Sequence, residues 1–157
     1  APLVAWYGAV EVVPQNQVLA AMRAAEDPDG VRRKAIIEPA DAAGLPPLAQ
    51  PEMHEGALVS YEPDEIVVRV DAPREGIVVL NEIMFPGWHV EVDGKAATPL
   101  RANYLLRAVV VGPGTHTITW RFEPRRWRIL VGSYLLALAV MLAAAVVPRR
   151  RRAPAAS

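Results

Sequence analysis

Short runs in which bulky, mainly apolar side chains recur at every second position fill the chain between residues 52 and 124. The clearest are EIVVRVDA (65–72) and THTITWRF (115–122), while GIVVLNEIM (76–84) is apolar enough to be buried on both faces. Successive side chains of a strand point to opposite faces, so a period of two predicts half-buried strands. At least six such strands between turns indicate a mainly β fold, an antiparallel β-sandwich or jelly-roll-like domain over residues 52–124.

Two turn signals separate the predicted strands. The pair Asp93-Gly94 follows the run WHVEV (88–92), and Asp-Gly at such a place favours a two-residue hairpin turn with a positive φ at Gly94. The tripeptide GPG (112–114) separates the last strand from NYLLRAVVV (103–111), which is predicted as a strand over its whole length.

Residues 1–38 carry a different pattern, which predicts a separate strand–helix–strand unit. LVAWYGAVEVV (3–13) is apolar and β-branched, QNQVLAAMRAAE (15–26) has apolar residues at helical spacing, and RKAIIE (33–38) reads as a second strand. Residues 39–51 hold four prolines and few large side chains. That composition predicts a Pro/Ala-rich linker between the two parts.

Residues 129–147 form an uncharged run of 19 residues, ten of which are Ile, Leu or Val. A helix of this length would be roughly 28 Å long, close to the ~30 Å hydrocarbon core of a bilayer. The ten aliphatic residues favour insertion by roughly 3–6 kcal/mol. The run therefore predicts a transmembrane helix, with a buried core helix or a cleaved C-terminal sorting signal as the alternatives.

The net charge of zero hides a division of the chain into two parts. Residues 1–124 hold 10 Lys and Arg and all 17 Asp and Glu, a net charge of −7, whereas residues 125–157 hold seven Arg and no acid. An acidic main part would repel phosphates, which argues against nucleic acid as a partner. The absence of cysteine from the sequence excludes disulfides and thiolate metal sites.

Arginines on both sides of the predicted span bear on its orientation. Three arginines precede the span and four follow it, at Arg149–Arg152. Positive charge is enriched on the cytoplasmic side of membrane helices. The small excess favours a basic cytoplasmic tail over residues 148–157 and an extracytoplasmic location for residues 1–124.

His89, Glu91 and Asp93 stand at alternate positions and invite the question of a metal or catalytic site. On a strand they would share one face, opposite the apolar Trp88 and Val90, so the simpler interpretation is a solvated strand face. A metal site needs three or more convergent ligands, and the sequence brings no further ligand beside these three. We therefore predict no metal site. The sequence also has no phosphate-cradling Gly-rich loop, and Ser60 and Ser133 lack the context of a nucleophile, so we assign no cofactor and no catalytic residue.

The strand tryptophans are the remaining candidates for ligand contact. Trp6, Trp88 and Trp120 could stack on sugar rings, although packing in the core is the commoner fate of a tryptophan in a strand. Trp88 follows the bend Pro86-Gly87 and is the candidate for carbohydrate contact. His116 falls on the apolar face of its strand, where a hydrogen-bonded core histidine is the simpler interpretation.

Residues 59 to about 147 carry a longer pattern, with the segments SYEP (60–63), FPGWHVEVDGK (85–95), RANYLLRAV (101–109) and GPGTHTITWRFEP (112–124), followed by an apolar run. This pattern resembles the C-terminal extracytoplasmic region of bacterial YfhO-like membrane proteins. The matching residues look mainly architectural: Pro86, Gly87, Trp88, Asp93, Gly94, Asn103, Tyr104, Arg107, Gly114 and His116. Phe85 departs from the family pattern, which often has Tyr at that place.

The resemblance implies a fragment of a polytopic GT-C-type glycosyltransferase that uses a polyprenyl-phosphate-linked sugar and acts on cell-envelope polymers. The catalytic carboxylate of that family lies in an early extracytoplasmic loop that this chain does not contain, so the resemblance implies a non-catalytic domain. Its partners would be the lipid bilayer, the upstream transmembrane part of the same protein and a glycan or lipid-linked sugar. A carbohydrate-binding module that recruits acceptor glycan and a structural membrane-anchored domain stay open as alternatives.

Overall fold

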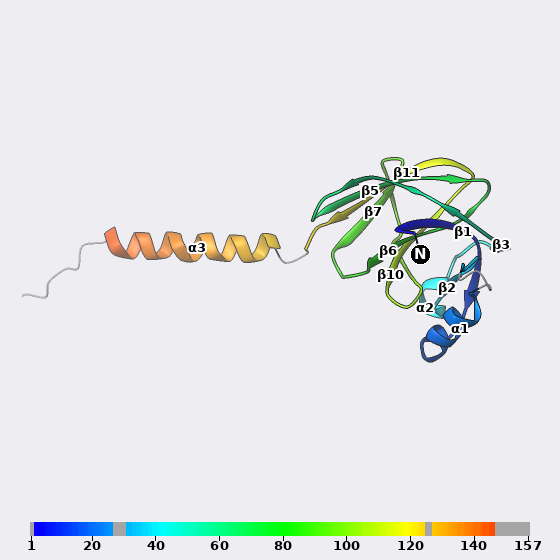
Figure 1. Ribbon diagram of the computed structural model, residues 1–157. Helices are drawn as coiled ribbons and strands as arrows, with labels where there is room; N and C mark the ends of the chain where they lie inside the picture. The colour runs from blue at the N-terminus through cyan, green and yellow to red at the C-terminus, as the bar shows by residue number, and fades with distance from the viewer. Residues whose placement is uncertain (1, 27–30, 125–126, 147–157) are drawn as a thin grey trace, which may run out of the picture. The chain divides into compact units, whose positions relative to one another are not determined.

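In the computed structural model the chain is mainly β, with 51% of it in strands and 22% in helices. The structure describes residues 2–26, 31–124 and 127–146. The chain divides into two units, Ala1–Glu123, which holds the strands, and Pro124–Ser157, which holds the helix α3 (Trp127–Val146) (Figure 1).

The first unit contains two sheets. The six-stranded sheet has the order β2 (Ala35–Ile37), β9 (Leu100–Ala102), β10 (Leu106–Val111), β6 (Gly76–Ile83), β1 (Val4–Val12) and β3 (Ala49–Glu55). The five-stranded sheet has the order β4 (Ala57–Tyr61), β5 (Glu65–Ala72), β11 (Gly114–Phe122), β7 (Trp88–Val92) and β8 (Lys95–Ala97). Every pairing between these strands is antiparallel except that of β1 with β2.

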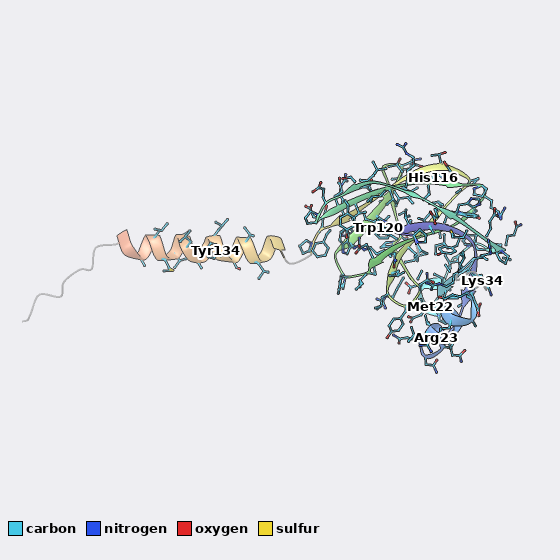
Figure 2. All side chains as sticks on the ribbon, in the orientation of Figure 1. Met22, Arg23, Lys34, His116, Trp120 and Tyr134 are labelled. Atoms are coloured by element: carbon cyan, nitrogen blue, oxygen red, sulfur yellow. The ribbon has the colours of Figure 1, made fainter. Side chains whose placement is uncertain are left out.

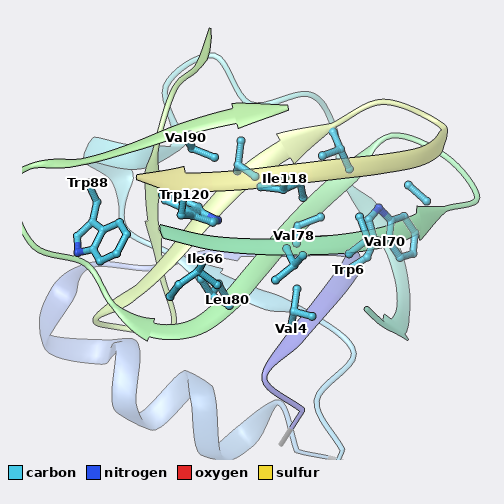
Figure 3. Close-up of a cluster of buried hydrophobic side chains, with 14 residues drawn as sticks. Val4, Trp6, Ile66, Val70, Val78, Leu80, Trp88, Val90, Ile118 and Trp120 are labelled. Carbon is cyan, nitrogen blue, oxygen red and sulfur yellow. The ribbon is translucent and has the colours of Figure 1, made fainter. Parts of the chain in front are cut away.

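The largest core cluster takes side chains from both sheets, which therefore pack against each other (Figure 3). Members from the six-stranded sheet include Val4, Trp6, Val78, Leu80, Val109 and Val111, and members from the five-stranded sheet include Ile66, Val68, Val70, Trp88, Val90, Ile118 and Trp120. These residues recur at every second position of their strands, as the alternation predicts. Each such side chain contributes roughly 1.5–3 kcal/mol through burial.

The six-stranded sheet closes on itself like a barrel, because β2 pairs with β1 as well as with β9. Its second face is also buried, where Ile77 and Val79 of β6 pack with Ile37 of β2 and with Leu48. The prediction that residues 76–84 are buried on both faces is thus confirmed for the first five residues of β6, all of which are buried.

The strand–helix–strand pattern at the N-terminus is confirmed, but it does not form a separate unit. β1 is followed by the 3-10 turn η1 (Gln15–Gln17) and the helix α1 (Val18–Ala24), and β2 pairs in parallel with the end of β1. The first half of β1 pairs with β6 on one side and β3 on the other. The predicted boundary between residues 1–38 and 52–124 therefore crosses one continuous sheet.

The prediction of a linker over residues 39–51 is wrong in part. Those residues hold the one-turn helix α2 (Pro39–Ala42) and the first three residues of β3. Pro51 lies in β3, which is an edge strand, the position in a sheet that tolerates proline.

The hairpin turn between β7 and β8 is confirmed, with φ values of 52° at Asp93 and 75° at Gly94. The predicted strand over residues 103–111 is wrong in its first three residues, since β10 begins at Leu106. Asn103 and Tyr104 have φ values of 48° and 78° and form a turn instead. The buried Asn103 stabilises this turn because its backbone N–H donates to Ile36 O and its Oδ1 accepts from Ile36 N.

The described residues of the second unit are Pro124 and the helix α3. Among the residues that the structure describes, no helix is both long enough and apolar enough to cross a membrane. The transmembrane helix predicted over residues 129–147 stays a prediction, and its last residue lies outside the described residues, as does the predicted cytoplasmic tail over residues 148–157.

Candidate functional site

The C-terminal end of β11, at Phe122 and Glu123, lies beside the ends of several other strands. We call this region the exit end. The backbone N–H of Glu123 donates to Gly87 O over 2.7 Å, just before β7 begins at Trp88. The N–H of Phe122 donates to Asp64 O over 2.8 Å, just before β5 begins. The last residue of β6, Ile83, pairs here with the first residue of β10.

A bulge at the exit end places two charged side chains between the sheets. Leu106 pairs with Ile83, but the next residue, Arg107, pairs with Leu80, so β6 carries two extra residues at this point. Bulges bend a strand and redirect its side chains, and they are common next to functional sites. One of the extra residues is Glu82.

Arg107 is the most deeply buried charged residue in the described chain, with 3% of its surface exposed. Its guanidinium carbon lies 3.6 Å from the centroid of the Trp88 ring and 5.9 Å from that of Trp120. Its Nε donates to Ile83 O over 3.1 Å, and its Nη2 lies 3.8 Å from Glu82 Oε2. Nη1 has no hydrogen-bond partner within the described residues.

Burial lowers the pKa of Arg107 below its ordinary value, and the nearby Glu82 and Tyr61 partly oppose that effect. Tyr61 of β4 donates its hydroxyl to Glu82 Oε1 over 2.6 Å, which raises the pKa of Tyr61 because the bond needs the phenol proton. A chain of polar contacts from Tyr61 through Glu82 to Arg107 thus connects the two sheets. This arrangement stabilises and orients the exit end, but it contains no nucleophile beside a base.

Trp88, the candidate for carbohydrate contact, lies at one end of the core cluster and is only 9% exposed (Figure 3). The Arg107 guanidinium covers its ring, and the Phe122 ring packs against it with the centroids 5.3 Å apart. Little of the ring is left for stacking on a sugar, so the glycan contact stays a prediction that the packing does not favour. Trp6 and Trp120 are 0% and 1% exposed.

Glu91 and Asp93, two of the three residues that stand at alternate positions, contact different partners. Glu91 accepts from Arg121 over 3.3 Å, and Arg121 also donates to Glu65, so a surface ion network crosses three strands. His89 is exposed beside this network. In the described ranges, no three His, Cys, Asp or Glu side chains lie close enough to hold a metal ion.

Asp93 belongs to a second polar group at the opposite ends of β7 and β11. Its Oδ2 lies 2.7 Å from His116 Nδ1, and its Oδ1 accepts from Thr117 N over 2.9 Å, which together hold the pKa of Asp93 below its ordinary value. The other ring nitrogen of His116, labelled in Figure 2, lies 3.0 Å from Gly112 O. Both ring nitrogens therefore have partners, as predicted, but His116 is half-buried and belongs to neither core cluster. The group stabilises the turn next to β8.

An open hollow of about 420 Å³ lies elsewhere on the first unit. Its lining residues are Ala43, Gly44, Leu45, Pro46, Glu75, Ala97, Thr98, Leu100, Val109 and Val110. Glu75 and Thr98 are the polar side chains in this set, and the set includes no aromatic ring. The hollow thus lacks the flat stacking surface that sugar-binding sites use.

The sequence reasoning missed the joint role of Tyr61, Glu82 and Arg107. A charged residue inside an apolar strand was the available signal, since Glu82 interrupts GIVVLNEIM and Arg107 interrupts NYLLRAVVV. Charged side chains are rarely buried unless they are paired, so each such position indicates a partner.

Comparison with family models, curated proteins and solved structures finds no match to this chain.

Proposed function

We propose that this chain is the non-catalytic, extracytoplasmic β-sandwich (jelly-roll-like) domain and last membrane helix of a polytopic GT-C-like glycosyltransferase. The whole enzyme would use a polyprenyl-phosphate sugar donor and act on cell-envelope polymers in the bacterial cytoplasmic membrane. The β domain would cover the active site or present the acceptor. The pattern of residues 59–147 and its resemblance to YfhO-like proteins support this assignment.

The observation that carries the proposal is the surface of α3. Residues 130–144 of this helix are all exposed, and none of them is charged (Figure 2). Leu and Val occupy every side of it, whereas a helix at a protein surface has one polar face. A helix that is apolar all round buries its surface in a membrane or in other protein, and the arginines at both ends of this run favour the membrane.

The polar contacts of the first unit favour a non-catalytic role for this part of the protein. Its best-defined polar groups are paired with one another, as in Tyr61–Glu82–Arg107 and Asp93–His116. Sugar transfer from a lipid-linked donor needs a carboxylate base held against the donor in a water-excluded cavity. A single membrane helix cannot build that cavity, so the upstream membrane part would supply it.

The membrane assignment is tested by placing charge in the middle of α3. In Leu136→Arg/Leu138→Arg, two arginines at about 2.5–3.5 kcal/mol each should cancel the insertion energy and move the chain into the carbonate-soluble fraction. Leu136→Ala/Leu138→Ala is the matched control and should stay with the membrane. Carbonate release of the unaltered chain would overturn the proposal.

The enzymatic assignment needs the full-length protein with its upstream part. Membranes that contain it should transfer labelled sugar from a polyprenyl-phosphate donor to envelope polymer, and residues 1–157 alone should transfer none. Turnover by the 157-residue chain would show that the domain itself is catalytic. Absence of transfer by the full-length protein across polyprenyl donors would reject the glycosyltransferase assignment.

A further inference from the structure

His116 contacts two hydrogen-bond acceptors, one with each nitrogen of its ring. Nδ1 lies 2.7 Å from Asp93 Oδ2, and Nε2 lies 3.0 Å from the backbone oxygen of Gly112. A backbone carbonyl and an ionised carboxylate only accept hydrogen bonds, whereas a neutral imidazole carries a single N–H. The ring can therefore donate to both oxygens only as the imidazolium cation, with a proton on each nitrogen.

The two acceptors of His116 belong to different sheets. Asp93 follows β7 of the five-stranded sheet, and Gly112 follows β10 of the six-stranded sheet. The His116 side chain, labelled in Figure 2, is only 15% exposed between them. At the exit end, Arg107 of the six-stranded sheet covers the ring of Trp88 of the five-stranded sheet. The two sheets are thus joined by a cation at each end of β7.

The charged groups of the neighbouring strand β5 lie on its other face. Val70 pairs with His116, and the flanking residues Arg69 and Asp71 are exposed on the opposite side of the sheet. The turn between β10 and β11, residues 112–113, has no charged side chain. The charge that His116 meets directly is therefore that of Asp93.

Asp93 is held in the ionised form that the contact needs. Its bond with His116, the N–H of Thr117 and the nearby Lys95 all favour the carboxylate. Histidine is the side chain among these groups that titrates between about pH 5 and pH 8. A change of pH in this range therefore acts on the contact through the ring of His116.

The hollow of about 420 Å³ is lined by residues that lead into the two turns which His116 joins. Ala97 of β8 belongs to the five-stranded sheet, and Val109 and Val110 of β10 belong to the six-stranded sheet. Gly112 comes two residues after Val110, and Asp93 comes four residues before Ala97. A change in the distance between the two turns is therefore transmitted to two walls of the hollow over short lengths of chain.

We infer that His116 is a proton-dependent clamp, which holds the two sheets together at the turns after β7 and β10 and controls the width of the hollow. With a proton on each ring nitrogen, both contacts are made. The neutral ring keeps one N–H, so its other nitrogen turns a lone pair toward an oxygen and that contact is lost. The contact to the Asp93 carboxylate is the stronger one because it is charge-assisted, so the contact to Gly112 breaks.

The direction of the pH effect follows from this geometry. The clamp closes as the pH falls through the range of about 5–8 in which histidine takes up a proton, and it opens as the pH rises through that range. Its contribution to stability is present on the acidic side of the range and is lost on the alkaline side. The inference concerns the first unit alone and does not depend on the proposed membrane location of α3.

Nitrogen NMR of the full 157-residue chain in detergent reads the protonation of His116 directly. At about pH 5.5 both ring nitrogens should carry a proton, and at about pH 8.5 one of them should be bare. The variant His116→Gln identifies the His116 signals among those of the three histidines. A ring that keeps one bare nitrogen at about pH 5.5 would refute the cation.

The opening itself is measured as the distance between two spin labels, since the chain has no native cysteine. The pair Lys95→Cys/Pro113→Cys places labels at exposed positions of the two turns. From about pH 5.5 to pH 8.5 the ratio of open to closed distances should rise about tenfold or more, because a hydrogen bond to a charged group is worth at least that factor. The change should have the same midpoint as the titration of the His116 nitrogens.

The pair Glu62→Cys/Leu105→Cys at the exit end is the matched control. Arginine keeps its charge over this pH range, so the distance between these labels should not change. The variant His116→Gln cannot be charged and should abolish the pH dependence of the first pair.

Three results would overturn the clamp. The first is a constant distance between the labels at 95 and 113 while His116 titrates. The second is a change that persists in His116→Gln, because another group would then be responsible. The third is an equal change in the control pair, which would show a general loosening of the first unit. If His116→Gln does not fold, the two label pairs in the chain with native His116 decide the question.

Discussion

Removal of Glu82 should destabilise the protein more than replacement of Arg107 by an apolar side chain of similar length. In Glu82→Ala the buried guanidinium keeps its charge and loses its carboxylate. At the observed 3.8 Å and an effective dielectric constant of about 20, the lost attraction is about 4 kcal/mol. Glu82 is 29% exposed, so water recovers part of this, and we expect a net loss of about 2–3 kcal/mol.

Arg107→Met removes the positive charge and also the free-energy cost of burying it. The variant loses the stacking on Trp88, worth about 2 kcal/mol when desolvated, a bond to Ile83 O of about 1.5–3 kcal/mol, and the same net attraction to Glu82 of about 2–3 kcal/mol. It also removes the desolvation penalty of the cation, several kcal/mol, and the unpartnered Nη1, about 1–3 kcal/mol. The two sets nearly cancel, so the net change should stay within about 1.5 kcal/mol of zero.

Urea unfolding in detergent, followed by tryptophan fluorescence, measures both variants. Glu91→Ala is the matched control, because it also removes a carboxylate from an arginine, but Arg121 is 49% exposed and the loss should stay below about 0.5 kcal/mol. If Glu82→Ala costs no more than Glu91→Ala, or less than Arg107→Met, the account of the exit end as a paired buried charge is refuted.

Three further predictions concern the β7–β8 hairpin, the loss of stability at low pH and the core. Gly94→Val should lower the unfolding free energy by about 1 kcal/mol or more, because φ is 75° there, and equal melting temperatures for Gly94→Val and the control Gly112→Ala would contradict it. The pKa of Asp93 is lowered by folding, so its stabilising contribution is present above its ordinary pKa of 3.8 and is lost as the pH falls through the folded value. Asp93→Asn should therefore lose less stability than the unaltered chain between about pH 5 and pH 2 in urea titrations, and parallel curves would speak against the Asp93–His116 contact. Trp88→Ala should cost about 3–5 kcal/mol, whereas Phe85→Ala at an exposed position should cost little. If the full-length protein proves to transfer sugar, a Trp88→Ala variant that melts like the unaltered protein but does not transfer would favour the glycan contact instead.

Much of the strand content was predictable because strand patterns are local. The runs over residues 65–72 and 88–92 match β5 and β7 residue for residue, and the Asp-Gly signal identified the turn between β7 and β8. Alternation reports directly which side chains face inward, since the period of two follows from the geometry of each strand alone. The start of β10 was missed because Asn103 and Tyr104 have positive φ values in a turn that is bonded through Asn103 to Ile36, a partner 67 residues away.

The pattern of apolar residues along the chain was sufficient to identify a mainly β unit, its inward-facing side chains, its hairpin turn and a C-terminal helix, since each of these depends on neighbours in sequence. Strand order depended on contacts between distant segments. β1 lies between β3 and β6, so residues that looked like a separate unit complete the sheet. The same holds at the exit end, where Arg107, Glu82 and Trp88 come from three strands. A guanidinium can be buried there only because folding brings a carboxylate and an aromatic face to it, and no local pattern encodes that meeting.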